Sequence, residues 1–525
     1  MTQEIPPITA DIQLDTLESK GLIRLATLRP ELEYLFRHAL VQDAAYGSLL
    51  KQERRELHGR VGEALEELYP ERVGELAPVL AMHFEQAGEN EKAIDYFASG
   101  AKHALDQNAI TEAFSAYERA AALIEQEDGA APPDGDPEAR ARRLRRQVEV
   151  QLGLARSGYS FRSPEDQYDA LERIVPEAEA TGDLRLVAEV HLLIALGRLQ
   201  NGESPTAPLV KRSLDRIGAA ADELGDRSLR ATPLALIGMS EVFAGSDVRA
   251  GVESLERALP LLEGSADSIG AAFARGALAM GYAMLGDFEN AEIAVQRTNE
   301  LAQEGDLIAQ LDAQIAESMV RAAMGQLDRA VPIAQDCVDR AEATGASACV
   351  VASSWVLGDA FHRQGKFAEA RDVLKRGSDV SSLLDRRVWR PTLQAWLGSA
   401  MAALGEVGGD QLDEALEVAR GIGNRIGEAG IRGKRAEVRA ARGDLDGARA
   451  DFEASQAIAK ELGLRPALAR GLRTWAEALR DAGRWDEAAE RYREALALFE
   501  ELKLEGEAAA VRTTLATGGA KLALS

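Results

Sequence analysis

The feature that most constrains the fold is a recurring turn: a glycine, two to four mostly polar residues, and then an alanine that opens a new helical pattern. It reads GENEKAIDYF from Gly88, GKFAEARDVL from Gly365 and GRWDEAAERY from Gly483. From Gly245 onward the turn glycines lie 38 to 41 residues apart, at Gly245, Gly286, Gly325, Gly365, Gly405, Gly443 and Gly483. A spacing this regular is typical of a solenoid, in which each repeat packs on its neighbours.

Each period carries two helical patterns. The turn glycine is expected to take the left-handed conformation that ends the first helix. A small residue seven positions earlier is expected to let the two helices approach closely, at Gly238, Ala279, Ser318, Gly358, Gly398, Ala436 and Ala476. The composition agrees with helices, because aromatic residues make up only 5% and helix-forming Ala, Leu, Glu and Arg dominate.

Two stretches, WVLGDAFHRQGKFAEARDVL and WAEALRDAGRWDEAAERYREALAL, resemble tetratricopeptide repeats, with the small, bulky and turn positions of that family in order. The resemblance covers most of the chain from Leu144 to Leu515, with weaker copies before Pro132. The period near 40 is longer than the usual ~34 residues, which indicates longer helices or looser connectors. The resemblance implies an all-α fold, an α-solenoid of helical hairpins.

The N-terminal segment has another character. LDTLESKGLIRL reads as a helix ending at Gly21 and leading into a short strand, and LEYLFRHALVQDAAYGSLL and RRELHGRVGEALEELYP predict two further helices. The segment is similar to a partial winged helix at the junction with the repeats in bacterial STAND-type signal-transduction ATPases, including those fused to class III nucleotidyl cyclases or LuxR-type regulators. The residues that carry this resemblance are Phe36, His38, Ala45, Tyr46, Leu50, His58 and the segment from Leu80 to Phe97.

In that family a nucleotide-binding module precedes the winged helix, and the repeat array acts as sensor. No GxxxxGK[ST] motif is present here, so this sequence offers no cradle for nucleotide phosphates. The predicted domains are a partial winged helix with junction helices at 1–60, the first hairpins at 61–126, a Pro/Gly/acidic linker at 127–138 and a superhelix at 139–520.

A basic run, ARARRLRRQ, follows the linker at residues 139–147. It is either a docking site for an acidic partner or nucleic acid, or the solvated first turns of an amphipathic helix, and the second interpretation is favoured because charge runs usually mark exposed faces. The net charge of −25 repels phosphate backbones and anionic lipid, so no nucleic-acid or membrane partner is expected.

No apolar stretch long enough to span a membrane and no leader at Met1 are visible, and the two cysteines, Cys337 and Cys349, form no CxxC pair. A reducing cytoplasm is therefore the expected location.

Enzyme motifs are missing from the sequence. The histidines never form an HExxH arrangement, and no GxSxG elbow occurs. A metal or switch role at His38, His58 or His83 is the alternative to an ordinary packed histidine, and the packed histidine is favoured. We therefore predict no catalytic residue, no cofactor and no metal.

A binding surface can be read from the position six residues before each turn glycine, which runs Met239, Met280, Met319, Asp359, Ser399, Glu437 and Glu477. In tetratricopeptide superhelices the first helix of each hairpin lines the concave groove. The predicted apolar trough for a partner peptide or amphipathic helix comprises Met239, Val242, Phe243, Phe273, Met280, Met284, Ile315 and Met319. The alternative is that these side chains simply pack between neighbouring helices.

The function predicted from the sequence is a non-enzymatic protein-interaction or sensor module in bacterial signal transduction. Two alternatives stay open: the regulatory part of a nucleotide-dependent ATPase or adenylate cyclase whose catalytic domains lie outside this chain, and a sensor that holds a small molecule in the groove.

Overall fold

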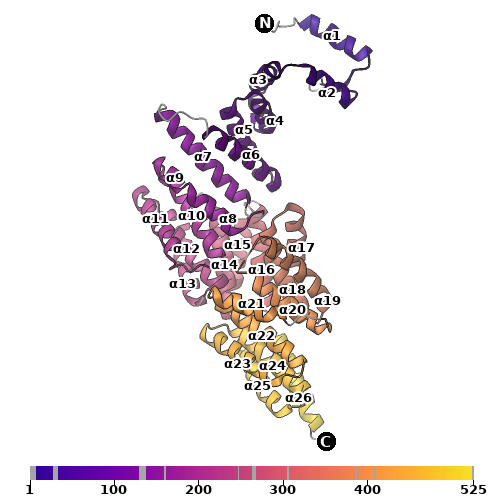
Figure 1. The fold of residues 1–525 in the computed structure, drawn as a ribbon. Helices are drawn as coiled ribbons and strands as arrows, with labels where there is room; N and C mark the ends of the chain where they lie inside the picture. Colours follow the sequence, from indigo (N-terminus) through magenta and orange to yellow (C-terminus); the bar gives the residue numbers. More distant parts are fainter. Residues whose placement is uncertain are drawn as a thin grey trace. The chain divides into compact units, whose positions relative to one another are not determined.

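The computed structural model describes residues 7–27, 33–128, 137–158, 161–245, 247–262, 268–303, 307–385, 387–406 and 410–522. Within these ranges it contains twenty-six α-helices and a single pair of strands, which confirms the predicted helical solenoid (Figure 1). No described helix is both long and apolar enough to cross a membrane. The chain divides into two compact units, residues 1–100 with 122–131 and residues 101–121 with 132–525. We call them the N-terminal unit and the repeat array.

The N-terminal unit begins with α1 (Pro7–Ser19) and an antiparallel hairpin of β1 (Ile23–Thr27) and β2 (Glu33–Phe36). Helices α2 (Ala39–Ser48), α3 (Lys51–Leu68) and α4 (Val73–Ala87) follow, with a 3-10 turn, η1 (Pro70–Arg72), before α4. As predicted, Gly21 takes a positive φ of 71° between α1 and the first strand.

One helix prediction in this unit is wrong at its start. Of the stretch from Leu32 to Leu50, residues Glu33–Phe36 form β2, and α2 begins only at Ala39. Two aromatic residues explain the difference, because Tyr34 and Phe36 favour a pleated strand and pair with Leu25 and Ile23 of β1. The second strand was missed because a short apolar run does not distinguish strand from helix.

Helices α5 (Asn90–Asp106) and α6 (Ile110–Asp128) carry the chain from one unit to the other. The repeat array continues with α7 (Pro137–Gly158), α8 (Pro164–Arg173), α9 (Val175–Ala180), α10 (Leu184–Gln200), α11 (Pro208–Leu224), α12 (Arg227–Ala244), α13 (Val248–Leu262), α14 (Ser268–Leu285), α15 (Phe288–Gln303), α16 (Leu307–Ala323), α17 (Leu327–Thr344), α18 (Ser347–Arg363), α19 (Phe367–Leu383), α20 (Arg390–Ala403), α21 (Asp410–Gly421), α22 (Arg425–Ala441), α23 (Leu445–Glu461), α24 (Arg465–Asp481), α25 (Trp485–Glu501) and α26 (Glu505–Leu522).

The repeat period has a simple local basis. Helices α22 to α25 each contain 17 residues, and three-residue connectors separate them. The predicted turn glycines adopt positive φ at Gly88, Gly286, Gly325, Gly365, Gly405, Gly443 and Gly483. Gly245 is the exception, since it is extended with φ −81°. Connectors between hairpins also contain glycines with positive φ, among them Gly345, Gly423 and Gly463. The smallest repeated element of the array is therefore one helix with its connector, and two of them make one period.

The predicted close approach within hairpins is confirmed. A Cβ added at Gly358 would lie 2.5 Å from Leu374 Cδ2, and one at Gly238 would lie 2.8 Å from the carbonyl oxygen of Gly251. The other small residues of the set, such as Ala279 and Ala436, are fully buried. The small side chains therefore let the two helices of a hairpin pack closely.

Successive turns of the array contact one another. Helix α12 contacts α22, and α14 contacts α24, ten helices further along the chain in both cases. The backbone nitrogen of Leu307 donates to Asn108 Oδ1 at 3.1 Å, and Arg387 pairs with Glu165 at 3.0 Å. Residues far apart in sequence thus contact one another within the array.

The predicted linker at 127–138 lies largely outside the described residues, since 129–136 are not among them. The basic run falls in α7, where Arg145 donates to Asp183 Oδ2 at 2.7 Å and the following Val148 is fully buried. That arrangement matches an amphipathic helix with an exposed charged face. The predicted domain boundaries stay predictions.

Candidate functional site on the inner face of the repeat array

The first helices of successive hairpins, α12, α14, α16, α18, α20, α22 and α24, pack side by side and form what we call the inner face. The predicted trough residues come from the first three of these helices. Four of them are core residues, with exposed fractions of 8% or less: Met239, Val242, Met280 and Ile315. These four side chains therefore pack between neighbouring helices and do not line an open trough.

The other four predicted residues are only partly buried, at Phe243, Phe273, Met284 and Met319. They pack at the edge of the apolar clusters formed by the buried residues of neighbouring hairpins. Met319 contacts three such clusters, which places it at a central position on the inner face. These four side chains offer the accessible part of the predicted trough.

An aromatic cluster extends this surface. The Phe243 ring lies 6.2 Å from Phe273 and 6.3 Å from Trp389, measured between centroids. The Trp355 ring lies 6.0 Å from both Trp389 and Trp396. The five rings come from α12, α14, α18, α20 and the connector before α20, so they form one group across several hairpins. The indole Nε1 of Trp355 is buried in this group without a hydrogen-bond partner.

A polar cluster continues the inner face over α18, α20 and α22. Trp396 Nε1 donates to Asp359 Oδ1 at 2.8 Å. His362 Nε2 lies 3.0 Å from Ser399 Oγ, which donates to Glu437 Oε2 at 3.1 Å. Lys434 Nζ donates to Glu437 at 3.1 Å and stands 5.3 Å from the Trp396 ring centroid.

The hydrogen bonds assign a protonation state to His362. Because Ser399 donates to Glu437, His362 Nε2 must donate to Ser399, and its Nδ1 is then free to accept from Lys434 at 3.4 Å. Burial and the neighbouring Lys434 charge lower the pKa of His362 to about 4, so the ring is neutral at pH 7. Glu477, further along this face, has its pKa raised by burial although 43% of its side chain is exposed.

Two of the singled-out histidines meet in the N-terminal unit. His58 Nδ1 lies 2.9 Å from His83 Nδ1, and Tyr46 Oη lies 3.1 Å from His58 Nε2. Sequence spacing did not reveal this pair, because the antiparallel packing of α3 on α4 brings together residues 25 positions apart. In the described part of the chain no group of three or more His, Cys, Asp or Glu side chains could hold a metal ion.

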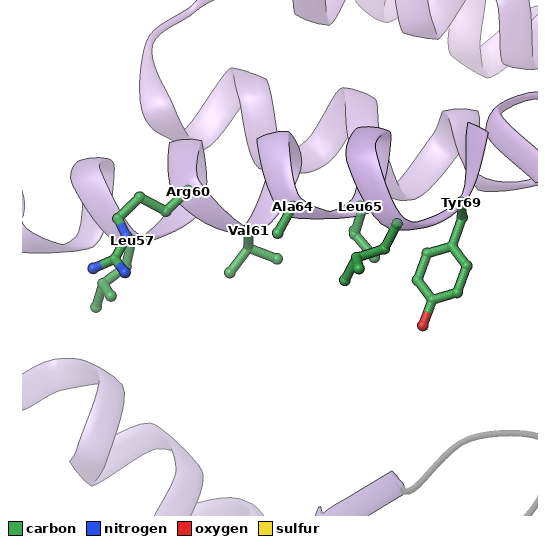
Figure 2. Close-up of a pocket in the computed structure, with 7 residues that line it drawn as sticks. Leu57, Arg60, Val61, Ala64, Leu65 and Tyr69 are labelled. Atoms are coloured by element: carbon green, nitrogen blue, oxygen red, sulfur yellow. The ribbon is translucent and has the colours of Figure 1, made fainter. Parts of the chain in front are cut away.

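The N-terminal unit also carries an apolar surface on α3. Leu57, Val61 and Leu68 are 38%, 42% and 69% exposed. Figure 2 shows Leu57, Val61, Leu65 and Tyr69 along one side of the helix, where they line a shallow pocket. We call this surface the α3 face. Of the seventeen exposed large apolar side chains in the described ranges, twelve lie between Ile12 and Met82, so exposed apolar area is concentrated in this unit.

Comparisons with known proteins agree with the repeat geometry. Residues 427–501 match the family model of the tetratricopeptide repeat, and they coincide with the hairpins of α22 to α25. A segment of 112 residues is 30% identical to an uncharacterized protein of Rhizobium meliloti (strain 1021), and the match covers 21% of this chain and 11% of that protein. The matched segment therefore spans only a small part of this curated relative.

Among solved structures, a Rap protein complexed with competence and sporulation factor is similar over 68% of this chain and 98% of its own, with 14% identity and a TM-score of 0.51. That likeness shows the helical-repeat fold alone. A signal-transduction ATPase with a tetratricopeptide-repeat sensor from Pyrococcus horikoshii aligns over 95% of this chain and 60% of its own, with 12% identity and a TM-score of 0.38, which is too low to support an argument.

Proposed function

We propose that this chain is a non-enzymatic interaction module of bacterial signal transduction, which acts in the cytoplasm by binding a peptide or an amphipathic helix of a partner protein on its inner face. The observation that carries this proposal is the aromatic cluster, in which Phe243, Phe273, Trp355 and Trp389 are only partly buried. Aromatic side chains dominate binding at many interfaces, and these rings form one group that is partly accessible.

The chemistry of the inner face fits a peptide. Met284 and Met319 are flexible and polarizable, so they adapt to varied apolar side chains. The polar cluster beside the rings offers the partly buried carboxylate of Glu437, which Lys434 holds in place and which supplies a hydrogen-bond acceptor for orientation. The similar Rap structure is a complex with competence and sporulation factor, and this supports the proposal by fold analogy alone.

The test compares two double variants of the full chain. Phe243→Ser with Phe273→Ser removes accessible rings from the inner face, whereas Ile293→Ser with Leu383→Ser removes side chains that are 59% and 84% exposed on α15 and α19. Peptides selected from a random library against the wild type serve as the probe. We expect the first variant to lose binding at least tenfold and the second to keep it, with thermal melts of both as a folding control.

Equal affinity of a folded inner-face variant and wild type for every selected peptide would contradict the proposal. Glutamate at Met239 or Met280 would not serve in this test, because both side chains are core residues and a buried charge unfolds the hairpin before it reports on binding.

A second candidate function has its own observation. The exposed apolar side chains of the N-terminal unit support the proposal that the chain is the regulatory part of a nucleotide-dependent ATPase or cyclase, with the catalytic module docked on this unit. Contiguous exposed apolar surface of this kind commonly marks a protein interface. The sequence resemblance to the STAND-type junction points to the same partner class.

This candidate is tested by capture from native lysate with wild type and with Val61→Glu combined with Leu68→Glu. We expect the wild type to retain a protein that hydrolyses ATP or cyclises it, and we expect the variant to lose it. Docking of a nucleotide-dependent module on this unit is rejected if the wild type captures no such activity, or if the variant captures as much as the wild type.

A further inference from the structure

Two arginines, one from the neighbouring α18 and one from the distant α24, donate to the end of α16. Arg363 Nη1 on α18 donates to the carbonyl oxygen of Ala322 at 2.7 Å, and Arg470 Nη2 on α24 donates to that of Ala323 at 2.6 Å. The last carbonyl groups of a helix have no partner within the helix, so they are natural acceptors for such side chains. Arg470 and Ala323 are 147 residues apart in sequence, and this contact joins successive turns of the array.

One carboxylate joins these arginines from the last helix. Glu507 on α26 accepts from Arg470 at 2.8 and 2.9 Å and lies 3.5 Å from both Arg363 and Arg473. Its side chain is only 13% exposed. Burial raises the pKa of Glu507, but the hydrogen bonds from Arg470 and the charges of Arg470, Arg363 and Arg473 together outweigh burial and hold the pKa below its ordinary value. The carboxylate is therefore charged at pH 7 and compensates the arginines.

An apolar contact accompanies the ionic one. A Cβ added at Gly286, in the turn between α14 and α15, would overlap Leu502 and lie 3.5 Å from Pro466. The neighbouring Met284, Leu285 and Phe288 pack against the core of the last repeats. The turn between α14 and α15 thus packs directly against α24 and the end of α25, which lie ten helices further along the chain.

We propose that these contacts form a clasp that holds one turn of the array against the next and limits access to the inner face. The ionic part of the clasp is Glu507 with Arg363, Arg470 and Arg473. Its apolar part is the contact between the turn at Gly286 and the side chain of Leu502. The regulatory meaning of the clasp rests on the proposed peptide binding. The existence of the clasp does not depend on peptide binding, because the separation of the two turns of the array can be measured without a partner.

The sensitivity of the clasp follows from its burial. Removal of the Glu507 charge takes from Arg470 the carboxylate that it holds at 2.8 Å, so Arg470 favours solvent over the closed arrangement. Arg363 and Arg473 keep longer pairs, with Asp359 at 3.7 Å and Glu477 at 3.5 Å. An exposed ion pair has no such effect, because water compensates its members. Glu500 provides the matched control, since it accepts from Arg512 at 2.7 and 3.0 Å while 48% of its side chain is exposed.

The experiment places spin labels at Ile293→Cys on α15 and Ala497→Cys on α25. Both positions are exposed, and each label lies on one of the two turns of the array that the clasp joins. The native Cys337 and Cys349 are buried and resist labelling. We expect Glu507→Gln to move the label-to-label distances to longer values and to increase acrylamide quenching of tryptophan, and Glu500→Gln to match the wild type. Identical distances in folded Glu507→Gln and wild type would overturn the clasp.

A steric variant tests the same inference independently of charge. Gly286→Ala and Gly365→Ala introduce the same backbone strain, at φ of 87° and 73°, but a Cβ at Gly365 meets nothing within 4 Å. We expect only Gly286→Ala to lengthen the label distances, and equal distances in both variants would contradict the apolar part of the clasp. Failure of the clasp leaves the peptide test unaffected, since that test depends on Phe243 and Phe273.

Discussion

The N-terminal unit and the repeat array place apolar side chains in opposite ways. In the array, Met280 on the inner face is 5% exposed, whereas in the N-terminal unit Val61 and Leu68 are 42% and 69% exposed on one helix. Repeats provide each other with packing surfaces, so the array buries its own apolar residues as each hairpin is added. In the described residues of the N-terminal unit, α3 instead leaves the apolar side chains of Val61 and Leu68 exposed.

The largest expected effect is a difference in stability when glutamate replaces an apolar side chain in each of the two regions. Met280→Glu puts a charge into the core of the array and should lower the free energy of unfolding by at least about 4 kcal/mol. Val61→Glu changes an exposed position and should alter it by less than about 0.5 kcal/mol. Urea unfolding of both variants is the measurement, and a similar loss in both would break the comparison.

The next effect depends on pH and concerns the array. His362, beside Asp359, Lys434 and Glu437, has a pKa of about 4 when folded against 6.5 ordinarily. Between these values the unfolded chain binds a proton that the folded chain does not, so stability is full above pH 6.5 and falls as the pH drops towards 4. The loss should approach about 3 kcal/mol.

Denaturation at pH 7.0, 5.5 and 4.5 measures this pH dependence, with His362→Gln as the non-titrating control. We expect a shallower pH dependence in the control, and an equal or steeper one than in the wild type would refute the assignment. The His58 and His83 pair has its pKa values lowered by burial as well, so the N-terminal unit should lose stability in the same direction.

Helix contact within hairpins gives a smaller effect. Gly358→Ala places a Cβ against Leu374 and should cost about 1 to 3 kcal/mol. Gly471 on α24 has nothing within 4 Å of an added Cβ, so Gly471→Ala should instead stabilise the array by about 0.5 to 1 kcal/mol. Thermal melts of both variants decide the point, and stabilisation by Gly358→Ala would show that the hairpins are looser than the structure indicates.

The smallest effect concerns a connector that departs from the pattern. Lys503, between α25 and α26, takes a φ of 57°, where the preceding connectors use Gly463 and Gly483. Lysine is strained in this conformation, so Lys503→Gly should raise the stability of the last repeats by about 1 kcal/mol. Hydrogen exchange of α26 measures this effect locally, and faster exchange in the variant would argue against strain at Lys503.

Much of the fold could be predicted from local chemistry. Turn glycines such as Gly365 and small residues such as Gly358 mark positions where one conformation or one close contact is required, and both appear directly in the sequence. Gly245 shows the limit of this reasoning, because an extended backbone also ends a helix. The strand Glu33–Phe36 was missed because a short apolar run fits a helix as well as a strand, and only the pairing with β1 decides between them.

The candidate site was less accessible to sequence reasoning. The methionine positions were found from their offset, but burial of Met239 and Met280 depends on the neighbouring helices. The cluster of Trp355, Trp389 and Phe243 forms because the array brings distant helices together, and no local period encodes that geometry. A concentration of tryptophan between residues 355 and 396, three of the five in the chain, was the available signal.

The most direct test of the central claim is the affinity of library-selected peptides, measured by fluorescence anisotropy, for wild type, the Phe243→Ser and Phe273→Ser variant, and Val61→Glu. The account predicts that binding is lost only in the inner-face variant and that Val61→Glu binds like wild type. Loss of binding in Val61→Glu with full affinity in the folded inner-face variant would contradict the account and place recognition on the N-terminal unit.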